Sequence, residues 1–228
     1  LHAFPTLRSS DLAFFGTARG VTNEVYYMAQ KAARFLGTPH VDNAARLCHA
    51  PSTAAMKQMI GVAASTCSYA DWIEADVIVF FGANPANDQP VTTKYLLEAK
   101  RRGARIVIVN PYLEPGMKRY WVPSAARSAL FGTAFVDEWY AVRQGGDIAF
   151  LYGTLKALFA AGGVDERFVA EHTGGCAALR EKASGLEWAE LENASGLARA
   201  SMETLARLIG GARNGVLVWS MGITQQPA

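Results

Sequence analysis

The chain has 228 residues, 50% of them apolar and 18% charged, with a formal net charge of +2. This is the composition of a globular protein large enough for one large or two small hydrophobic cores. No strongly basic face for nucleic acid is indicated, because the densest basic cluster, Lys100 to Arg102, is more typical of a helix terminus than of a phosphate patch.

Cysteine usage indicates the compartment. The three cysteines, Cys48, Cys67 and Cys176, are odd in number and far apart. A disulfide framework is therefore not expected, and a reducing, cytoplasmic location is the default prediction. The sequence has no CxxC pair, so this chain by itself is not expected to hold an iron–sulfur cluster. It also has no run of 18 apolar residues, so we expect no membrane span.

The first twelve residues, LHAFPTLRSSDL, lack the charged and apolar regions of a signal peptide. They resemble translated sequencing-adapter read-through, and we expect a non-native leader that packs poorly. The chain stops at Gln226–Ala228, directly after an expected strand and loop. We therefore expect an internal fragment of a longer protein.

The first predicted helix begins near Thr22, a capping hydroxyl followed by the acid Glu24, and runs to Leu36. Residues 16–20, GTARG, then form a turn aimed at the helix N-terminus. Such a turn commonly binds an anion, and Arg19 would add a positive charge. A plain strand-to-helix turn explains the same residues equally well.

The stretch 43–53, NAARLCHAPST, places Cys48 directly before His49, and Ser52 could cap a helix that runs to Ile60. A thiolate is a soft ligand suited to a redox-active metal, and the neighbouring imidazole can exchange a proton. On spacing alone, a buried apolar cysteine beside a surface histidine remains the commoner interpretation.

Two continuous apolar runs, residues 75–81 and 105–109, predict strands buried on both faces. A turn at residues 82–87 and a helix at 91–100 lie between them, which is the length of a βαβ unit and predicts a parallel sheet. Ligands of such sheets bind at the carboxyl ends of the strands.

Two further strands are predicted at residues 136–143 and 216–220. Asp147 is expected to cap a helix over 148–160, and further helices are expected at 164–172, 177–183 and 202–209. We expect polar or glycine residues after the strands to line one continuous rim: Gly82, Asn84, Asn110, Gly145 and Gln225. Such a rim favours a long, phosphate-bearing ligand, with ordinary turn chemistry as the alternative.

Six segments taken in order carry a family resemblance: GTARGVTNE, NAARLCHAPS, FFGANPAND, VIVNP, VRQGGDIAFLYG and WSMGITQ. Together they resemble the central part of the molybdopterin-dependent formate dehydrogenases of the DMSO reductase superfamily, over residues 13–226. The stretch from Asn110 to Asp147 is longer than in the best-known members and resembles a formate-dehydrogenase-like branch.

The resemblance implies an α/β fold, a Rossmann-like three-layer parallel sheet with flanking helices. Residues 13–45 would belong to a first α/β cofactor domain and residues 46–228 to a second, molybdopterin-binding domain. The implied activity is two-electron oxidation of formate or a similar small-molecule substrate at molybdenum. An electron-transfer protein is a possible partner.

The resemblance also implies site residues. Cys48 stands where the family has the cysteine or selenocysteine ligand of molybdenum, and His49 where it has a proton-accepting histidine. The positions that contact bis-molybdopterin guanine dinucleotide in the family are matched by Arg19, Asn84, Asn87, Asn110, Gly145 and Asp147. Gly82 belongs to the expected cofactor-binding rim, and the loop that approaches the pterin would contain Met221 and Gln225. Asn110 and Tyr112 depart from the family, which often has Asp and Arg there. A 4Fe-4S cluster is expected before residue 13, and a substrate arginine after residue 228.

Three other readings compete. A catalytically silent scaffold subunit predicts loss of the metal ligand, whereas Cys48 and His49 are present. A plain nucleotide-binding Rossmann module expects G-x-G-x-x-G after the first strand, where the chain has none. The isolated fragment could also be inactive and prone to aggregate through exposed apolar edges.

Overall fold

The computed structural model describes residues 11–17 and 19–226. The chain divides into two compact units, residues 1–64 and 65–228, and each is described by itself. The domain boundary implied by the resemblance, between residues 45 and 46, differs from this division, and the domain assignment stays a prediction. The leader proposed for residues 1–12 lies almost entirely outside the described residues.

The first unit contains two short parallel strands and two longer helices. Its elements are β1 (Phe14–Gly16), α1 (Asn23–Phe35), β2 (Val41–Asn43), the 3-10 helix η2 (Ala44–Arg46) and α2 (Ala50–Ile60). Helix α1 begins as predicted, with Thr22 at the N-cap position, but the Thr22 hydroxyl makes no capping hydrogen bond. The prediction that Ser52 caps α2 is wrong, because His49 is the N-cap residue. Pro51 lies in the first turn, where its missing N–H costs nothing, so the helix begins ahead of Ser52.

The second unit is built on a four-stranded parallel sheet in the order β5-β4-β3-β6. Its strands are β3 (Val77–Phe81), β4 (Arg105–Val109), β5 (Glu138–Tyr140) and β6 (Gly215–Trp219). Strand β5 is shorter than the predicted 136–143, because the Val142 N–H donates to the Tyr140 carbonyl (2.9 Å) and the backbone turns away there.

Helices connect these strands. They are α3 (Tyr69–Ile73), α4 (Pro85–Asp88), the 3-10 helix η3 (Pro90–Thr92), α5 (Thr93–Arg101), α6 (Pro115–Lys118), α7 (Ala126–Phe131), α8 (Asp147–Ala160), α9 (Glu166–His172), α10 (Cys176–Gly185), α11 (Trp188–Ser195), α12 (Arg199–Gly210) and α13 (Met221–Thr224). Asp147 is the first residue of α8 and not its cap, which is Gly146. Within the described part of the chain, no helix has the length and apolar character needed to cross a bilayer.

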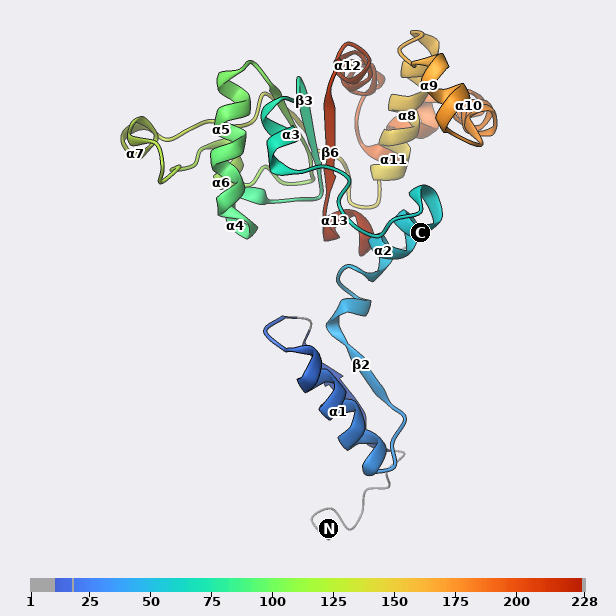
Figure 1. Ribbon diagram of the computed structural model, residues 1–228. Helices are drawn as coiled ribbons and strands as arrows, with labels where there is room; N and C mark the ends of the chain where they lie inside the picture. Colours follow the sequence, from blue (N-terminus) through green and yellow to red (C-terminus); the bar gives the residue numbers. More distant parts are fainter. Residues whose placement is uncertain (1–10, 18, 227–228) are drawn as a thin grey trace. The chain divides into compact units, whose positions relative to one another are not determined.

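Alternate residues of the buried strands point into two separate cores. Ile78 and Phe80 pack with residues of α3 and α5, whereas Val77, Val79 and Phe81 pack with residues of α8, α11 and α12. Figure 1 shows these two groups of helices on opposite faces of the sheet. The predicted three-layer α/β fold is therefore confirmed for the second unit.

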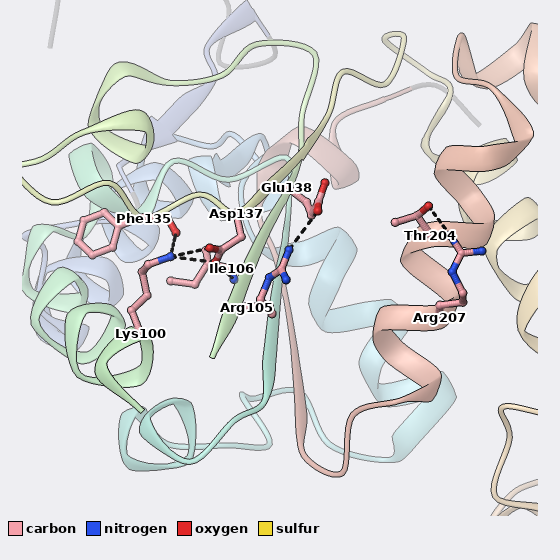
Figure 2. A network of polar contacts seen from close by, with 8 residues as sticks. All are labelled: Lys100, Arg105, Ile106, Phe135, Asp137, Glu138, Thr204 and Arg207. Carbon is pink, nitrogen blue, oxygen red and sulfur yellow. Dashed lines mark hydrogen bonds and ion pairs between the residues drawn. The ribbon is translucent and has the colours of Figure 1, made fainter. Parts of the chain in front are cut away.

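Ion pairs and hydrogen bonds fix the amino edge of this sheet (Figure 2). The Lys100 ammonium of α5 donates to both carboxylate oxygens of Asp137 (2.9 Å), and Asp137 also accepts from the Ile106 N–H (2.8 Å). Arg105 pairs with Glu138 across β4 and β5 (3.1 Å). The amino ends of β4 and β5 are therefore held together by structural contacts.

Candidate cofactor site

The carboxyl ends of all four strands lie along one side of the sheet, here called its carboxyl edge, and the predicted rim residues follow them. All four strands are parallel, so the segments that follow them leave the sheet at the same edge. Gly82 follows β3, Asn110 follows β4, Gly145 follows β5 and Gln225 follows β6. Their predicted location beyond the carboxyl ends of the strands, which Asn84 after β3 shares, is confirmed, whereas one continuous rim and the roles of its residues stay predictions.

The chain order reverses between β3 and β6, which makes this the switch point of the sheet. Here the backbones of two loops meet. The Gly222 N–H donates to the Gly82 carbonyl (3.2 Å), and a Cβ on Gly82 would lie 2.7 Å from the Gly222 backbone. Gly82 also has φ +56°, a conformation that favours glycine. Only glycine fits this crossing without a shift of the backbone.

Asn84 presents an unpaired acceptor beside this crossing. Its Oδ1 atom is buried and has no hydrogen-bond partner within the described part of the chain. Asn84 occupies the N-cap position of α4, yet its side chain does not cap the helix. Native proteins pair nearly all buried acceptors, and an unpaired one costs roughly 1–3 kcal/mol. Asn84 Oδ1 is thus suited to accept a hydrogen bond from a bound group.

Asp147 places a buried carboxylate at the start of α8. Its side chain is only 7% exposed, and burial raises its pKa above the ordinary value, partly opposed by a hydrogen bond from Gln226. The Gln226 Nε2 donates to Asp147 Oδ2 (3.0 Å) and also to the Gly222 carbonyl. Gln226 therefore joins α8 to the loop after β6.

The other rim residues are more open. Asn87 is exposed on α4 and Gly145 is exposed before α8. Asn110 is held by its backbone, since its N–H donates to the Tyr140 carbonyl (3.1 Å) and its carbonyl accepts from Trp139 Nε1 (2.9 Å).

Two exposed residues of the last loop lie close together. Met221 is the first residue of α13, and Gln225 directly follows the helix. The Gln225 Nε2 lies 3.5 Å from the Met221 sulfur. Sequence reasoning missed Gly222 and Gln226 as parts of this edge. A glycine shortly after a buried strand was the available signal for Gly222, whereas nothing local marked Gln226.

The remaining predicted residues lie in the first unit. Arg19 is exposed in the turn between β1 and α1. Cys48 is partly buried in the turn before α2, where its N–H donates to the Ala44 carbonyl (3.0 Å). His49 is exposed, and its Nδ1 lies 3.4 Å from Thr53 Oγ1, one turn along α2.

Cys48 belongs to no cluster of metal-binding side chains in the described part of the chain. Within residues 11–17 and 19–226, no group of three or more His, Cys, Asp or Glu side chains could hold a metal ion. The structure thus places the rim residues beyond the carboxyl ends of the strands in the second unit, and describes Arg19, Cys48 and His49 within the first.

Comparison with known proteins gives consistent matches. The family model described as Molybdopterin oxidoreductase matches residues 6–228. The match begins inside the segment predicted to be a leader. Protein YdeP of Escherichia coli K12 is 30% identical over 223 residues, covering 92% of this chain and 29% of the relative. The uncharacterized oxidoreductase Rv2900c of Mycobacterium tuberculosis H37Rv is 30% identical over 226 residues, covering 96% and 29%.

Formate dehydrogenase H of E. coli K12 is 29% identical over 211 residues, covering 92% of this chain and 27% of the relative. Among solved structures, acetylene hydratase from Pelobacter acetylenicus superposes with a TM-score of 0.67 at 18% identity. That superposition covers 91% of this chain and 26% of the other, and it shows likeness of fold. The chain therefore spans between 26% and 29% of the length of these proteins.

Proposed function

Because the chain belongs to the molybdopterin oxidoreductase family, we propose that its carboxyl-edge loops bind bis-molybdopterin guanine dinucleotide and that Cys48 ligates the molybdenum. The family itself implies molybdenum and a molybdopterin cofactor. The guanine dinucleotide form belongs to the proposal. So does the reaction, the two-electron oxidation of formate or a similar small substrate.

The buried, unpaired Oδ1 of Asn84 is the observation that carries this proposal. A guanine dinucleotide carries N–H and O–H donors, which a buried carbonyl oxygen can accept. The other groups at this edge also suit a nucleotide, because amides, a carboxylate and glycine backbone can meet the base, the ribose and the phosphates. The residues that would hold the cofactor are Arg19, Gly82, Asn84, Asn87, Asn110, Gly145, Asp147, Met221 and Gln225.

Cys48 and His49 would provide the chemistry of the chain itself. Molybdenum supplies a two-electron redox centre when the cofactor is bound. The Cys48 thiol would lose its proton to act as a soft ligand. Oxidation of formate to carbon dioxide releases one proton and two electrons. With His49 Nδ1 directed toward Thr53, the Nε2 atom is the nitrogen that we assign to the proton.

The electrons need an acceptor. We include in the proposal a 4Fe-4S cluster in a segment ahead of this chain and an electron-transfer protein as partner. A cytoplasmic location completes the proposal, since cysteines that are all free suit a reducing compartment.

Replacement of Cys48 tests the proposal in the complete, cofactor-loaded protein. Cys48→Ala should keep most of the guanine dinucleotide, because the rim contacts lie on other residues, but should abolish formate-dependent dye reduction. Cys67→Ala is the matched control, since Cys67 is also a free thiol and is exposed. Normal dye reduction in Cys48→Ala would refute the assignment. A loss of equal size in Cys67→Ala would show that thiol removal harms the protein non-specifically.

A further inference from the structure

An arm of the second unit, residues 117–135, leaves the sheet between β4 and β5 and returns to it. Its two ends are fixed in the core, since Met117 and Phe135 are fully buried and the Phe135 N–H donates to the Met117 carbonyl (3.4 Å). Farther out, Tyr120 and Thr133 pair as an antiparallel bridge, with N–H to carbonyl distances of 2.9 and 2.7 Å. Figure 1 shows α7 at the outer end of this arm.

Polar contacts inside the arm fix its conformation. Ser128 is only 4% exposed, and its hydroxyl accepts from the Val122 N–H (2.9 Å) and from the Thr133 hydroxyl (2.8 Å). The same hydroxyl donates to the Tyr120 carbonyl (3.2 Å). The Arg119 guanidinium donates to the Phe131 carbonyl. The arm is therefore a preorganised element of the fold.

Three large apolar side chains are nevertheless exposed on the arm. Trp121 is 61% exposed, Leu130 79% and Phe131 67%. Trp121 directly follows one residue of the antiparallel bridge, and Phe131 precedes the other by two positions. Together they expose on the order of 400 Å² of apolar surface, given the size of such side chains. Exposed apolar surface of this extent is comparable with the largest apolar patch of a typical monomeric protein, which is often functional.

The charge of the arm has one sign. Residues 115–136 contain the three cations Lys118, Arg119 and Arg127 and no Asp or Glu. Lys118 and Arg127 are exposed and form no ion pair with a carboxylate in the described part of the chain. The arm therefore complements a partner that offers both negative charge and apolar surface.

We propose that the arm anchors the protein to an anionic lipid surface. An exposed tryptophan beside leucine, phenylalanine and basic residues is the composition that partitions into the interface of a bilayer. The positive charge of the arm complements anionic lipid headgroups, and its exposed tryptophan, leucine and phenylalanine can insert among the outer acyl chains.

Co-sedimentation of the full chain with vesicles tests the proposal. The probes are vesicles of pure phosphatidylcholine and vesicles with about one quarter phosphatidylglycerol. We expect binding to the anionic vesicles, weakened by salt, and little binding to the neutral ones. The double variant Lys118→Gln/Arg127→Gln should lower the partition coefficient about 30-fold, because two surface cations are lost. Arg102→Gln, an exposed cation outside the arm, is the control and should leave it unchanged.

The apolar contribution is tested separately. Leu130→Ser/Phe131→Ser should lower partitioning at least about tenfold, whereas Phe168→Ser, which replaces an exposed phenylalanine on α9, should have no effect. Lipids with brominated acyl chains should quench part of the tryptophan fluorescence, and Trp121→Phe should remove that part.

Three results would overturn the proposal. One is equal binding to neutral and anionic vesicles. Another is an equal loss in the Phe168 control. The third is no binding by a chain whose near-ultraviolet circular dichroism shows native packing, which would favour an acidic protein as the partner of the arm.

Discussion

Replacement of Gly82 by alanine perturbs the crossing of loops at the switch point between β3 and β6. The new Cβ would lie 2.7 Å from the Gly222 backbone and 2.9 Å from the Ile223 nitrogen, and backbone atoms cannot rotate away as a flexible side chain can. We expect a steric cost of about 1–3 kcal/mol. The positive φ of Gly82 adds about 1–2 kcal/mol for a residue with a Cβ. The expected loss in unfolding free energy is therefore about 2–5 kcal/mol.

Gly103→Ala is the matched control in the same unit. Gly103 also has a positive φ, +96°, but a Cβ there would meet nothing within 4 Å. We expect only the conformational cost of about 1–2 kcal/mol. The difference between the two variants isolates the close approach of the loops.

Urea unfolding followed by tryptophan fluorescence measures this difference. All five tryptophans, Trp72, Trp121, Trp139, Trp188 and Trp219, lie in the second unit, so the signal reports on that unit alone. Equal losses of stability in Gly82→Ala and Gly103→Ala would refute the close approach at the carboxyl edge. Retention of full cofactor content in Gly82→Ala, despite the expected destabilisation, would argue that this crossing does not shape the cofactor site.

Three other predictions concern single side chains. Asp137→Ala removes the carboxylate that joins Lys100 to β4 and should lower the unfolding free energy by about 1–3 kcal/mol. The control Arg101→Ala, which breaks an exposed ion pair, should change the unfolding free energy by less than about 0.5 kcal/mol. Equal urea midpoints for the two variants would contradict this prediction. Hydrogen bonds from backbone N–H groups before β6 lower the pKa of Asp76 below its ordinary value of 3.8. The ionised Asp76 should therefore make wild type more stable than Asp76→Asn at pH values above 3.8. This difference in unfolding free energy should disappear as the pH falls through the lower pKa of the folded state. A constant difference in unfolding free energy from pH 6 to about pH 2 would exclude this linkage. Asn84→Ala should lower retention of the guanine dinucleotide about fivefold to tenfold, which corresponds to the loss of one hydrogen bond. The cofactor-free chain should not lose stability, because Asn84 Oδ1 has no hydrogen-bond partner in the described part of the chain. Unchanged cofactor content after dialysis would exclude Asn84 from the cofactor site.

The buried sheet could be predicted from the sequence because its strands have a continuous apolar pattern. The expected strand 105–109 matches β4, and the expected strand 75–81 contains β3. Both are buried on nearly every residue, and such runs have few alternatives. A parallel sheet then places the following loops at one edge, so the rim could be predicted without coordinates.

Other features could not be predicted because they depend on distant partners. Strand β2 is only three residues long, contains Asp42 and Asn43, and forms through pairing with β1. The bond between Gln226 and Asp147 joins residues 79 positions apart. The roles of the rim residues are implied by family resemblance and not by a local sequence pattern.

The arm shows a related limit. The basic and apolar composition of residues 117–135 is visible in the sequence. Which of its apolar side chains are buried is decided by the fold, since Met117 and Phe135 are buried whereas Leu130 and Phe131 are exposed. A sequence pattern alone does not separate these two pairs.

X-ray absorption at the molybdenum K-edge tests the central claim most directly. The complete protein is purified with its cofactor as wild type and as Cys48→Ser, at matched molybdenum content. If Cys48 ligates the metal, the variant should lose one sulfur from the first coordination shell and gain an oxygen in its place, because serine offers a harder ligand. An identical sulfur shell in the two proteins would contradict the assignment of Cys48 as the metal ligand.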